Sequence, residues 1–218
     1  MTTTVYFDLD GTLLKYTMPF DDQFASVISE ESTAEMAAQF SDQVLDGITG
    51  IKPDPYERAF EEVCDRYDLS SDPSSLATEY IQTQAASMTI DPSVGRLLET
   101  VADRHRTGIL TNGDGPMQWR KIEEHGLDEI VDEVIVSNDL GARKPDPEIF
   151  EEAKARLPAD AYIYIGDTYE HDIVPARERG FETVYVGDEE RPEATVAASG
   201  PDALASLLLP LLETTDDR

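Results

Sequence analysis

Short apolar runs alternate with helical patterns along most of this 218-residue chain. The runs are rich in β-branched and aromatic residues, which is typical of buried strands. Helical patterns start at Pro92, Pro116 and Pro147, and proline is favoured at the first helical position because no N–H donor is needed there. Strands that alternate with helices predict an α/β fold, a doubly wound Rossmann-like parallel sheet with ligands bound beyond the carboxyl ends of its strands. The predicted strands are residues 5–7, 108–110, 133–136, 161–165 and 182–186.

The alternation stops between residues 15 and 88, where helical patterns follow one another without a strand pattern. A helical block of this length, inserted directly after the first strand, predicts a separate cap domain rather than a crossover between strands. We therefore expect an α-helical cap at residues 15–88 and a core domain made of residues 1–14 and 89–218. Residues 189–198 are polar and are expected to form a loop before a short helix at 203–212 and a charged tail.

Four apolar residues recur at near-helical spacing in the predicted cap: Phe20, Phe24, Met36 and Phe40. Their spacing favours packing within the cap over a ligand pocket. Two other segments are the expected sources of ligand specificity, namely residues 13–19 at the hinge and residues 46–55, which are rich in Gly and Pro. Cys64 is the single cysteine, so no internal disulfide forms, and its helical surroundings predict a buried small residue.

The charge balance is strongly acidic, with 46 Asp and Glu residues against 17 Lys and Arg and a net charge of -29 at pH 7. Such a surface repels nucleic acid and anionic membranes, so neither is an expected partner. Repulsion among the acids should matter little at molar salt, where the screening length is about 3 Å. We therefore expect a halophilic protein of a high-salt cytoplasm. No segment has the pattern of a signal peptide or a membrane span, and a monomer is expected.

Two carboxylates follow the first predicted strand. Asp8 and Asp10 come directly after residues 5–7, and Gly11 gives the backbone freedom to turn away. Acids this close repel each other, so an arrangement that keeps both ionised favours a bound cation, and hard oxygen ligands suit Mg²⁺. Asp and Gly are also common where a strand ends in a turn. This stretch alone leaves a metal site and a plain turn equally open.

Polar residues follow three further predicted strands. Thr111 and Asn112 precede a helix start, where hydroxyl, amide and free N–H groups suit a phosphate. Lys144 also precedes a helix, and Asp167 and Asp172 follow the strand at 161–165. Each cluster taken alone is also explained by turn, cap or surface chemistry. Because parallel strands end at one edge of the sheet, their joint placement predicts a single site there.

Four motifs together resemble those of the haloacid dehalogenase-like hydrolase superfamily. They are DLDGT at 8–12, TNG at 111–113, RKPDPEIF at 143–150 and GDTYEHD at 166–172. Each follows a predicted strand in the order found in that superfamily, and the helical block matches its cap inserted after the first motif. The resemblance implies a capped phosphatase that hydrolyses a small phosphorylated metabolite.

The resemblance also implies how the acids act. Asp8 would attack phosphorus and become an aspartyl phosphate, which divides one difficult displacement into two. Asp10 would protonate the leaving alcohol and then activate the hydrolytic water. The main-chain carbonyl of Asp10 would hold Mg²⁺ together with Asp8 and Asp167. Asp172 would support the metal through water or orient the lysine of the third motif.

The remaining motif residues are implied to bind the phosphoryl group. Thr111 and the main chain after it, including Asn112, would donate hydrogen bonds to its oxygens. Leu9 would turn its side chain away so that its backbone faces the same group. Lys144 would neutralise the charge that develops during transfer. Phosphoryl transfer depends mainly on such positioning and charge neutralisation.

Other reactions share parts of this pattern. Superfamily members that displace halide from carbon lack an acid at the position of Asp10, so this residue argues against a 2-haloacid dehalogenase. A phosphonate-cleaving member would need a cap lysine that forms a Schiff base with its substrate. A sugar-phosphate mutase shares all four motifs but would need cap bases for a second phosphate, and the predicted cap offers few: Lys15, Lys52, Arg58 and Arg66. A binding protein without activity is a further alternative.

Overall fold

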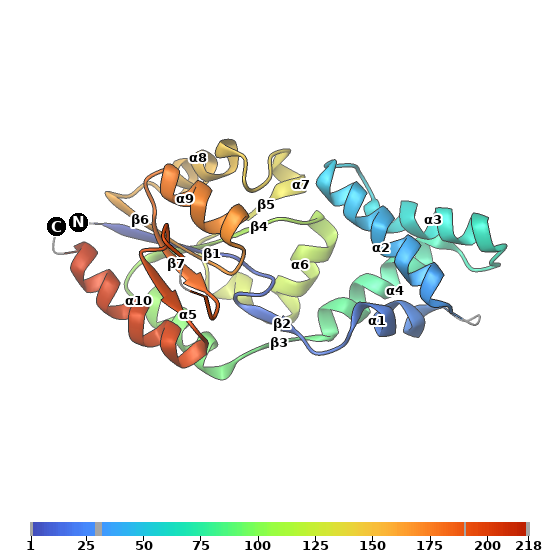
Figure 1. The fold of residues 1–218 in the computed structure, drawn as a ribbon, viewed down its shortest axis with the longest axis horizontal. Coiled ribbons are helices and arrows are strands. Elements are labelled where there is room, and N and C mark those ends of the chain that lie inside the picture. Colours follow the sequence, from blue (N-terminus) through green and yellow to red (C-terminus); the bar gives the residue numbers. More distant parts are fainter. Residues whose placement is uncertain (1, 29–31, 190, 217–218) are drawn as a thin grey trace.

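The computed structural model describes residues 2–28, 32–189 and 191–216. Within these residues, six parallel strands form one sheet in the order β5-β4-β1-β6-β7-β8 (Figure 1). All five predicted strands are present, and the predicted doubly wound α/β fold is confirmed. Because β1 lies between β4 and β6, three motif loops leave the sheet side by side. The strands are β1 (Thr3–Phe7), β4 (Arg106–Thr111), β5 (Glu133–Val136), β6 (Ala161–Gly166), β7 (Glu182–Val186) and β8 (Val196–Ala198).

Helices cover both faces of the sheet, and each face has its own apolar core (Figure 1). Val5 and Phe7 of β1 point to the face covered by α5 and α10, whereas Tyr6 points to the face covered by α8 and α9. This alternation follows from the two-residue period of a strand. The helices of the core domain are α5 (Pro92–Ala102), α6 (Gly115–Glu124), α7 (Ser137–Leu140), α8 (Pro147–Arg156), α9 (Val174–Glu178) and α10 (Pro201–Asp216).

Among the described residues, four helices of the segment predicted as the cap pack together beyond the carboxyl ends of the strands, and this group is called the cap below (Figure 1). They are α1 (Phe20–Val27), α2 (Ala34–Thr49), α3 (Pro55–Tyr67) and α4 (Pro73–Ala86). Aromatic rings fill the centre of the cap, where the Phe40 and Phe60 ring centroids are 4.3 Å apart. Met117 of α6 is buried in the same cluster, so the cap packs directly on the core domain. Phe24, Met36, Phe40 and Cys64 are buried as predicted.

The chain enters and leaves the cap through a two-stranded antiparallel ribbon. Its strands are β2 (Leu14–Tyr16) and β3 (Met88–Ile90), and Lys15 pairs with Thr89. The expectation that no strand interrupts residues 15–88 is therefore wrong at both ends of that segment. Strands of three residues are too short to show an alternating pattern, and this pair forms because the fold brings its two segments together.

Further corrections concern segments of irregular composition. The predicted loop at 189–198 contains β8, which pairs with β7 at the edge of the sheet. Helix α2 continues through Thr49, so the first part of the 46–55 segment is helical, and α10 is longer than the predicted helix. The motif residues after β6 form a π-helical turn, Tyr169–Ile173, followed by α9. The last two residues of the charged tail lie outside the described residues.

Phe20 does not belong to the core of the cap, because 47% of its surface is exposed. The prediction is wrong for this residue because Phe20, the first residue of α1, packs on Tyr16 and lines the cavity that Asp10 also lines. No helix among the described residues is both long enough and apolar enough to cross a bilayer.

Candidate active site

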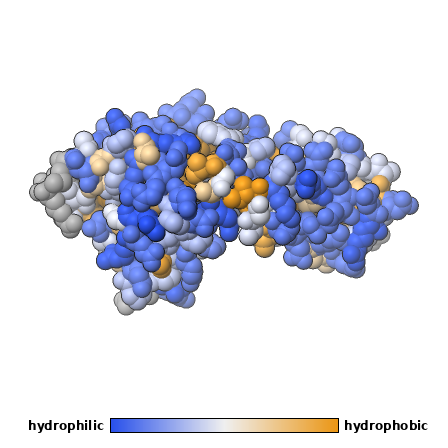
Figure 2. Space-filling view, turned by 90° about the horizontal axis from the view of Figure 1, so that it is seen from above, coloured by the Kyte–Doolittle hydropathy of each residue, from blue (hydrophilic) through white to orange (hydrophobic). Residues whose placement is uncertain are grey.

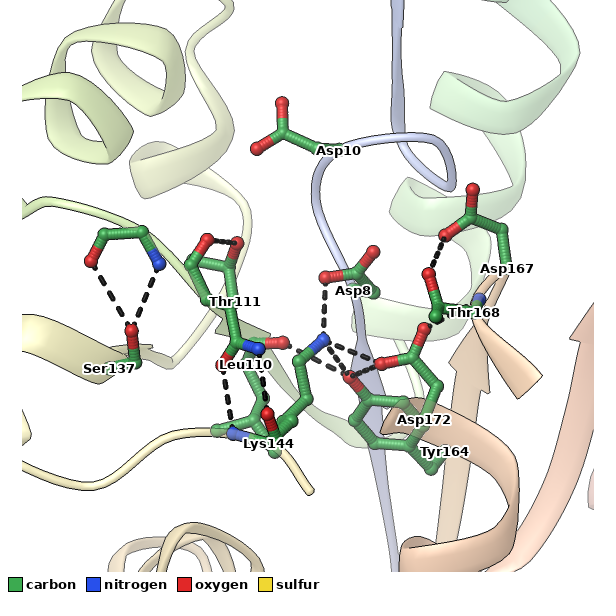
Figure 3. Close-up of polar contacts among 12 residues, drawn as sticks. Asp8, Asp10, Leu110, Thr111, Ser137, Lys144, Tyr164, Asp167, Thr168 and Asp172 are labelled. Carbon is green, nitrogen blue, oxygen red and sulfur yellow. Dashed lines mark hydrogen bonds and ion pairs between the residues drawn. The ribbon is translucent and has the colours of Figure 1, made fainter. Parts of the chain in front are cut away.

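The motif residues that follow β1 and β6, and the loop before α8, meet at one edge of the sheet (Figure 3). Asp8 follows β1 directly, and its backbone N–H donates to the carbonyl of Ile165 on β6, 2.8 Å away. This bond continues the ladder between the two strands by one residue. The side chain of Asp8 is buried, with 6% of the residue exposed. A buried carboxylate at this point requires a nearby positive charge.

Lys144 supplies that charge. Its ammonium nitrogen lies 2.7 Å from Asp8 Oδ1, 2.6 Å from Asp172 Oδ1 and 2.8 Å from the Tyr164 hydroxyl (Figure 3). Burial disfavours the charged ammonium, but Asp172 and Asp8 outweigh it and raise the pKa of Lys144 above its ordinary value. Lys144 is therefore a fixed cation at the centre of the site.

Three carboxylates of the motifs lie close enough to share one metal ion. Oxygens of Asp8, Asp167 and Asp172 all lie within 4.8 Å of one another. Burial, together with the charges of Asp172 and Asp167, raises the pKa of Asp8 to about 8 against the opposing charge of Lys144. Burial and the charge of Asp172 also raise the pKa of Asp167. Carboxylate oxygens that repel one another in this way fit a divalent cation such as Mg²⁺.

Gly11 allows Asp167 to reach this position. The backbone of Gly11 has a φ of 86°, and a Cβ atom there would lie 2.0 Å from Asp167 Oδ2. Any larger residue would be strained in the left-handed region and would also displace the carboxylate. The glycine of the first motif thus keeps the third acid in the cluster.

Asp10 points away from the Lys144 cluster (Figure 3). Lys121 lies 2.8 Å and 3.0 Å from its two carboxylate oxygens, Gln118 Nε2 donates to it at 2.8 Å, and the Tyr16 hydroxyl donates at 3.1 Å. Burial alone would raise the pKa of Asp10, but the charge of Lys121 and these hydrogen bonds bring the pKa below its ordinary value. The Asp10 carboxylate therefore lies apart from the three acids that are close enough to share a metal.

The TNG motif connects both groups of residues. Thr111 accepts a hydrogen bond from Gln118 Nε2 at 2.8 Å. The side chain of Asn112 holds the backbone of Lys144, accepting from its N–H at 2.8 Å and donating to its carbonyl at 2.9 Å. Leu9 is completely buried, so its side chain faces the core as the resemblance implied. Asn112 thus positions the lysine with its side chain, while its main-chain carbonyl accepts a hydrogen bond from Gln118 Nε2 at 3.3 Å.

Sequence reasoning missed four residues of this site: Tyr16, Gln118, Lys121 and Tyr164. Lys121 carried a usable signal, because it lies four residues after Met117 and beside Ile122 on the buried face of α6. A lysine in that position needs an acidic partner. Tyr16 carried no such signal, since its contact with Asp10 depends on the unpredicted strand β2.

A cavity of 270 Å³ lies between the cap and the core domain and opens onto Asp10. Asp10, Lys121 and Gln118 line it from the core side. Residues of α2, α3 and α4, together with Tyr16 and Phe20, form the opposite wall. Asp8 is not among the described lining residues, so the cavity is on the Asp10 side of the site.

A sequence model of haloacid dehalogenase-like hydrolases matches residues 5–186, a range that includes all four motifs. The chain belongs to the haloacid dehalogenase-like hydrolase family. This confirms the resemblance seen in the motifs. Among its relatives in this family, a glyceraldehyde 3-phosphate phosphatase of Methanocaldococcus jannaschii is 28% identical over 195 residues, which are 84% of this chain and 83% of the relative. A ribulose-1,5-bisphosphate 5-phosphatase of Halopiger xanaduensis is 29% identical over 217 residues, 91% of this chain and 90% of the relative.

Solved structures of haloacid dehalogenase-like hydrolases share the fold. A 2-haloacid dehalogenase from Pseudomonas syringae superposes with a TM-score of 0.72 at 22% identity, covering 97% of this chain and 100% of the other. A magnesium-bound hydrolase from Bacillus subtilis superposes with a TM-score of 0.68 at 21% identity, covering 95% and 98%. At these identities the likeness establishes the architecture alone.

Proposed function

We propose that the chain is a Mg²⁺-dependent phosphomonoester hydrolase that acts on a small phosphorylated metabolite through an aspartyl phosphate. The observation that carries this proposal is the contact of 2.7 Å between Lys144 and Asp8, beside a cluster of three carboxylates. A fixed cation against a buried carboxylate is what transfer of a phosphoryl group to that carboxylate needs. Further support comes from the two relatives above, both of which carry phosphatase names.

Asp8 is the proposed nucleophile. One of its carboxylate oxygens forms a bond to phosphorus while the bond from phosphorus to the ester oxygen breaks. Lys144, held by Tyr164 and Asp172, balances the negative charge on both groups. Mg²⁺, bound by Asp8, Asp167 and the main-chain carbonyl of Asp10 with Asp172 in support, would neutralise the phosphoryl oxygens and keep Asp8 ionised. The main chain of residues 9 and 112 and the hydroxyl of Thr111 would orient the phosphoryl group.

Asp10 is the proposed acid and base. The first step needs the protonated form of Asp10, which binding of the substrate must favour against the charge of Lys121, and its proton passes to the oxygen of the leaving alcohol. In the second step the Asp10 carboxylate takes a proton from water that attacks the aspartyl phosphate. Asp10 lines the cavity, so a leaving alcohol bound there would lie on the same side of the site as its proton donor. Lys121 and Gln118 hold the carboxylate of Asp10 and act as positioning residues.

The placement of the cap bases favours hydrolysis over a mutase reaction. A mutase must bind a second phosphate, which needs unpaired cations in the cavity. Lys52 pairs with Asp46 and Arg66 pairs with Glu35 on the surface. No lysine or arginine of the cap is among the described residues that line the cavity. The chain shares its fold with 2-haloacid dehalogenases. Superfamily members that displace halide lack an acid at the position of Asp10, so the presence of Asp10 argues against that reaction.

We also propose that the protein works as a monomer in a high-salt cytoplasm, without nucleic acid or membrane partners. The net charge of -29 supports this setting, because screening by salt reduces repulsion among the acids. Oligomeric state and location stay predictions from the sequence.

Release of inorganic phosphate tests the proposed function. Purified protein with Mg²⁺ and molar KCl is incubated with a panel of phosphate monoesters, and Asp8→Asn is compared with Asp22→Asn, an exposed acid at the start of α1. We expect Asp8→Asn to reduce turnover by about 10⁴-fold or more, and Asp22→Asn to leave it unchanged. A sugar monophosphate that is isomerised without phosphate release would favour the mutase. Phosphate release that persists in Asp8→Asn would overturn the proposal.

A further inference from the structure

Aromatic rings dominate the wall of the cavity that faces Asp10. Five of the described lining residues are aromatic: Tyr16, Phe20, Phe40, Tyr56 and Tyr80. Aliphatic side chains of α2 lie beside them, namely Val44, Leu45 and Ile48. Figure 2 shows hydrophobic colour gathered near the junction of the cap and the core domain, on a face that is otherwise hydrophilic. On a protein with a net charge of -29, a cluster of this kind indicates a binding surface.

Two of these side chains are exposed although they are large and apolar. Phe20 is 47% exposed and Leu45 is 64% exposed. The ring of Phe20 meets that of Tyr16 edge to face at a centroid distance of 4.8 Å, which fixes one side of the cavity entrance. Apolar side chains that stay exposed do not contribute the stability that burial would give. Their exposure is consistent with side chains that become buried when a ligand binds.

The cavity offers no free positive charge to a ligand. Asp10 and Lys121 are the charged residues among those described as lining it, and they pair with each other at 2.8 Å. Their charges therefore cancel at short range. A second phosphate or a carboxylate on the ligand would enter this space without a partner, at a high cost in desolvation.

We infer that the cavity binds the leaving alcohol of the substrate, and that this alcohol is uncharged and contains a flat ring. The inference rests on the proposed function, because Asp10 delivers its proton into this cavity. A ring stacks against the aromatic wall or meets it edge to face, as aromatic pairs prefer. Ser41 lies in the same wall and supplies a polar group for the edge of the ring, whereas the amide nitrogen of the neighbouring Gln84 already donates to Gln23 and Tyr80. A phenolic or benzylic alcohol and a nucleoside both have this chemistry.

A matched set of esters distinguishes these ligands. Phenyl phosphate and a pyrimidine nucleoside 5′-monophosphate carry a ring, ethyl phosphate carries none, and glyceraldehyde 3-phosphate and ribulose 1,5-bisphosphate are polar or doubly charged. We expect kcat/KM for at least one ring-bearing ester to exceed that for ethyl phosphate and for the bisphosphate by about tenfold or more. Comparison of phenyl phosphate with the nucleoside monophosphate then shows whether the preferred ring is a phenyl group or the base of a nucleoside. A higher kcat/KM for glyceraldehyde 3-phosphate or ribulose 1,5-bisphosphate overturns the inference and leaves the proposed function intact.

Two variants test whether the preference for a ring-bearing ester depends on the cavity wall. Phe20→Ala removes an aromatic lining residue, and Met18→Ala removes an exposed apolar side chain two residues away that does not line the cavity. We expect Phe20→Ala to reduce kcat/KM for the preferred ring-bearing ester by about tenfold and for ethyl phosphate by less than about twofold. Met18→Ala should match the wild type for both. Equal losses for both esters in Phe20→Ala would contradict the inference.

Calorimetric binding separates failure of the cavity inference from failure of the proposed function. The Asp8→Asn protein is titrated with phenyl phosphate, the nucleoside monophosphate and ethyl phosphate in the presence of Mg²⁺ and KCl. Tighter binding of a ring-bearing ester supports the inference even if the wild type hydrolyses none of them, a result that would overturn only the proposed function. Equal affinity for all three esters overturns the inference whatever the turnover.

Discussion

The ammonium nitrogen of Lys121 lies 2.8 Å from one carboxylate oxygen of Asp10 and 3.0 Å from the other. The side chain of Lys121 is 3% exposed and that of Asp10 is 26% exposed. The lysine therefore depends on the acid for its charge balance more than the acid depends on the lysine, because water reaches the acid. Removing the acid should therefore lower the stability of the protein more than removing the lysine.

A double-mutant cycle should reveal this difference in the free energy of unfolding, measured by denaturant without metal. Asp10→Asn leaves a buried cation without its partner and should lower the free energy of unfolding by about 3 kcal/mol. Lys121→Met leaves a carboxylate that water can reach and should cost about 1 kcal/mol. The double variant should cost less than the sum of the two. Arg120→Met, which removes an exposed partner of Glu124 on the same helix, is the control and should change stability by less than about 0.5 kcal/mol. Additive losses would show that the two residues are not coupled.

Gly11→Ala should disrupt both the fold and metal binding. A Cβ atom at Gly11 would lie 2.0 Å from Asp167 Oδ2, and the φ of 86° is unfavourable for alanine. Gly180 has a φ of 85° with nothing within 4 Å of its Cβ position, so Gly180→Ala carries the same backbone strain without the clash. We expect Gly180→Ala to cost about 1 kcal/mol and to keep its thermal stabilisation by Mg²⁺. Gly11→Ala should cost more and lose that stabilisation, and equal behaviour of the two variants would refute this role of Gly11.

Stabilisation by Mg²⁺ should increase with pH. Burial raises the pKa of Asp8 from 3.8 to about 8 in the metal-free protein. The folded state then holds a proton that the unfolded state has lost, so metal-free stability falls as pH rises between these values. Mg²⁺ needs the ionised carboxylate, so its effect on the melting temperature should be larger at about pH 8 than at about pH 5.5.

Two carboxyl variants control for the site of this effect. Asp167→Asn removes a member of the acid cluster and should abolish the shift caused by Mg²⁺. Glu170→Gln removes an exposed acid on the same loop and should retain it. A shift by Mg²⁺ that is the same at both pH values, or that survives in Asp167→Asn, would contradict the assignment.

Monovalent salt should raise both stability and substrate affinity. The net charge of -29 opposes folding and repels an anionic ester, and molar KCl screens both effects. We expect the melting temperature to rise and KM to fall from low to molar KCl. A melting temperature that does not respond to KCl would exclude adaptation to high salt. A KM that rises steadily would exclude the effect on substrate capture.

The strands and the four motif loops could be predicted from the sequence because their signals are local. A buried strand such as β6 is a continuous apolar run, and Asp167 and Asp172 come directly after it. Because parallel strands end at one edge of the sheet, the residues that follow them lie close together in the fold. The order of the motifs, together with this edge, was enough to place Lys144 beside Asp8.

The rest of the site depends on contacts that no local pattern records. Lys121 lies in the helical pattern that starts at Pro116, and its link to Asp10 spans 111 residues of sequence. Tyr16 reaches Asp10 only because β2 pairs with β3, a ribbon of three-residue strands. Phe20 has the same helical spacing as its buried neighbours, and its place in the cavity wall follows from its contact with Tyr16, which no local pattern records.

The ribbon of β2 and β3 also makes the cap a replaceable module. Because Lys15 pairs with Thr89, the first and last residues of the cap leave the core domain side by side. Insertions are tolerated where the two ends of the inserted segment are close together, since the host fold then needs no rearrangement. A different helical block could therefore be joined to the same two strands and alter which ester enters, while the sheet and its acids stay as they are.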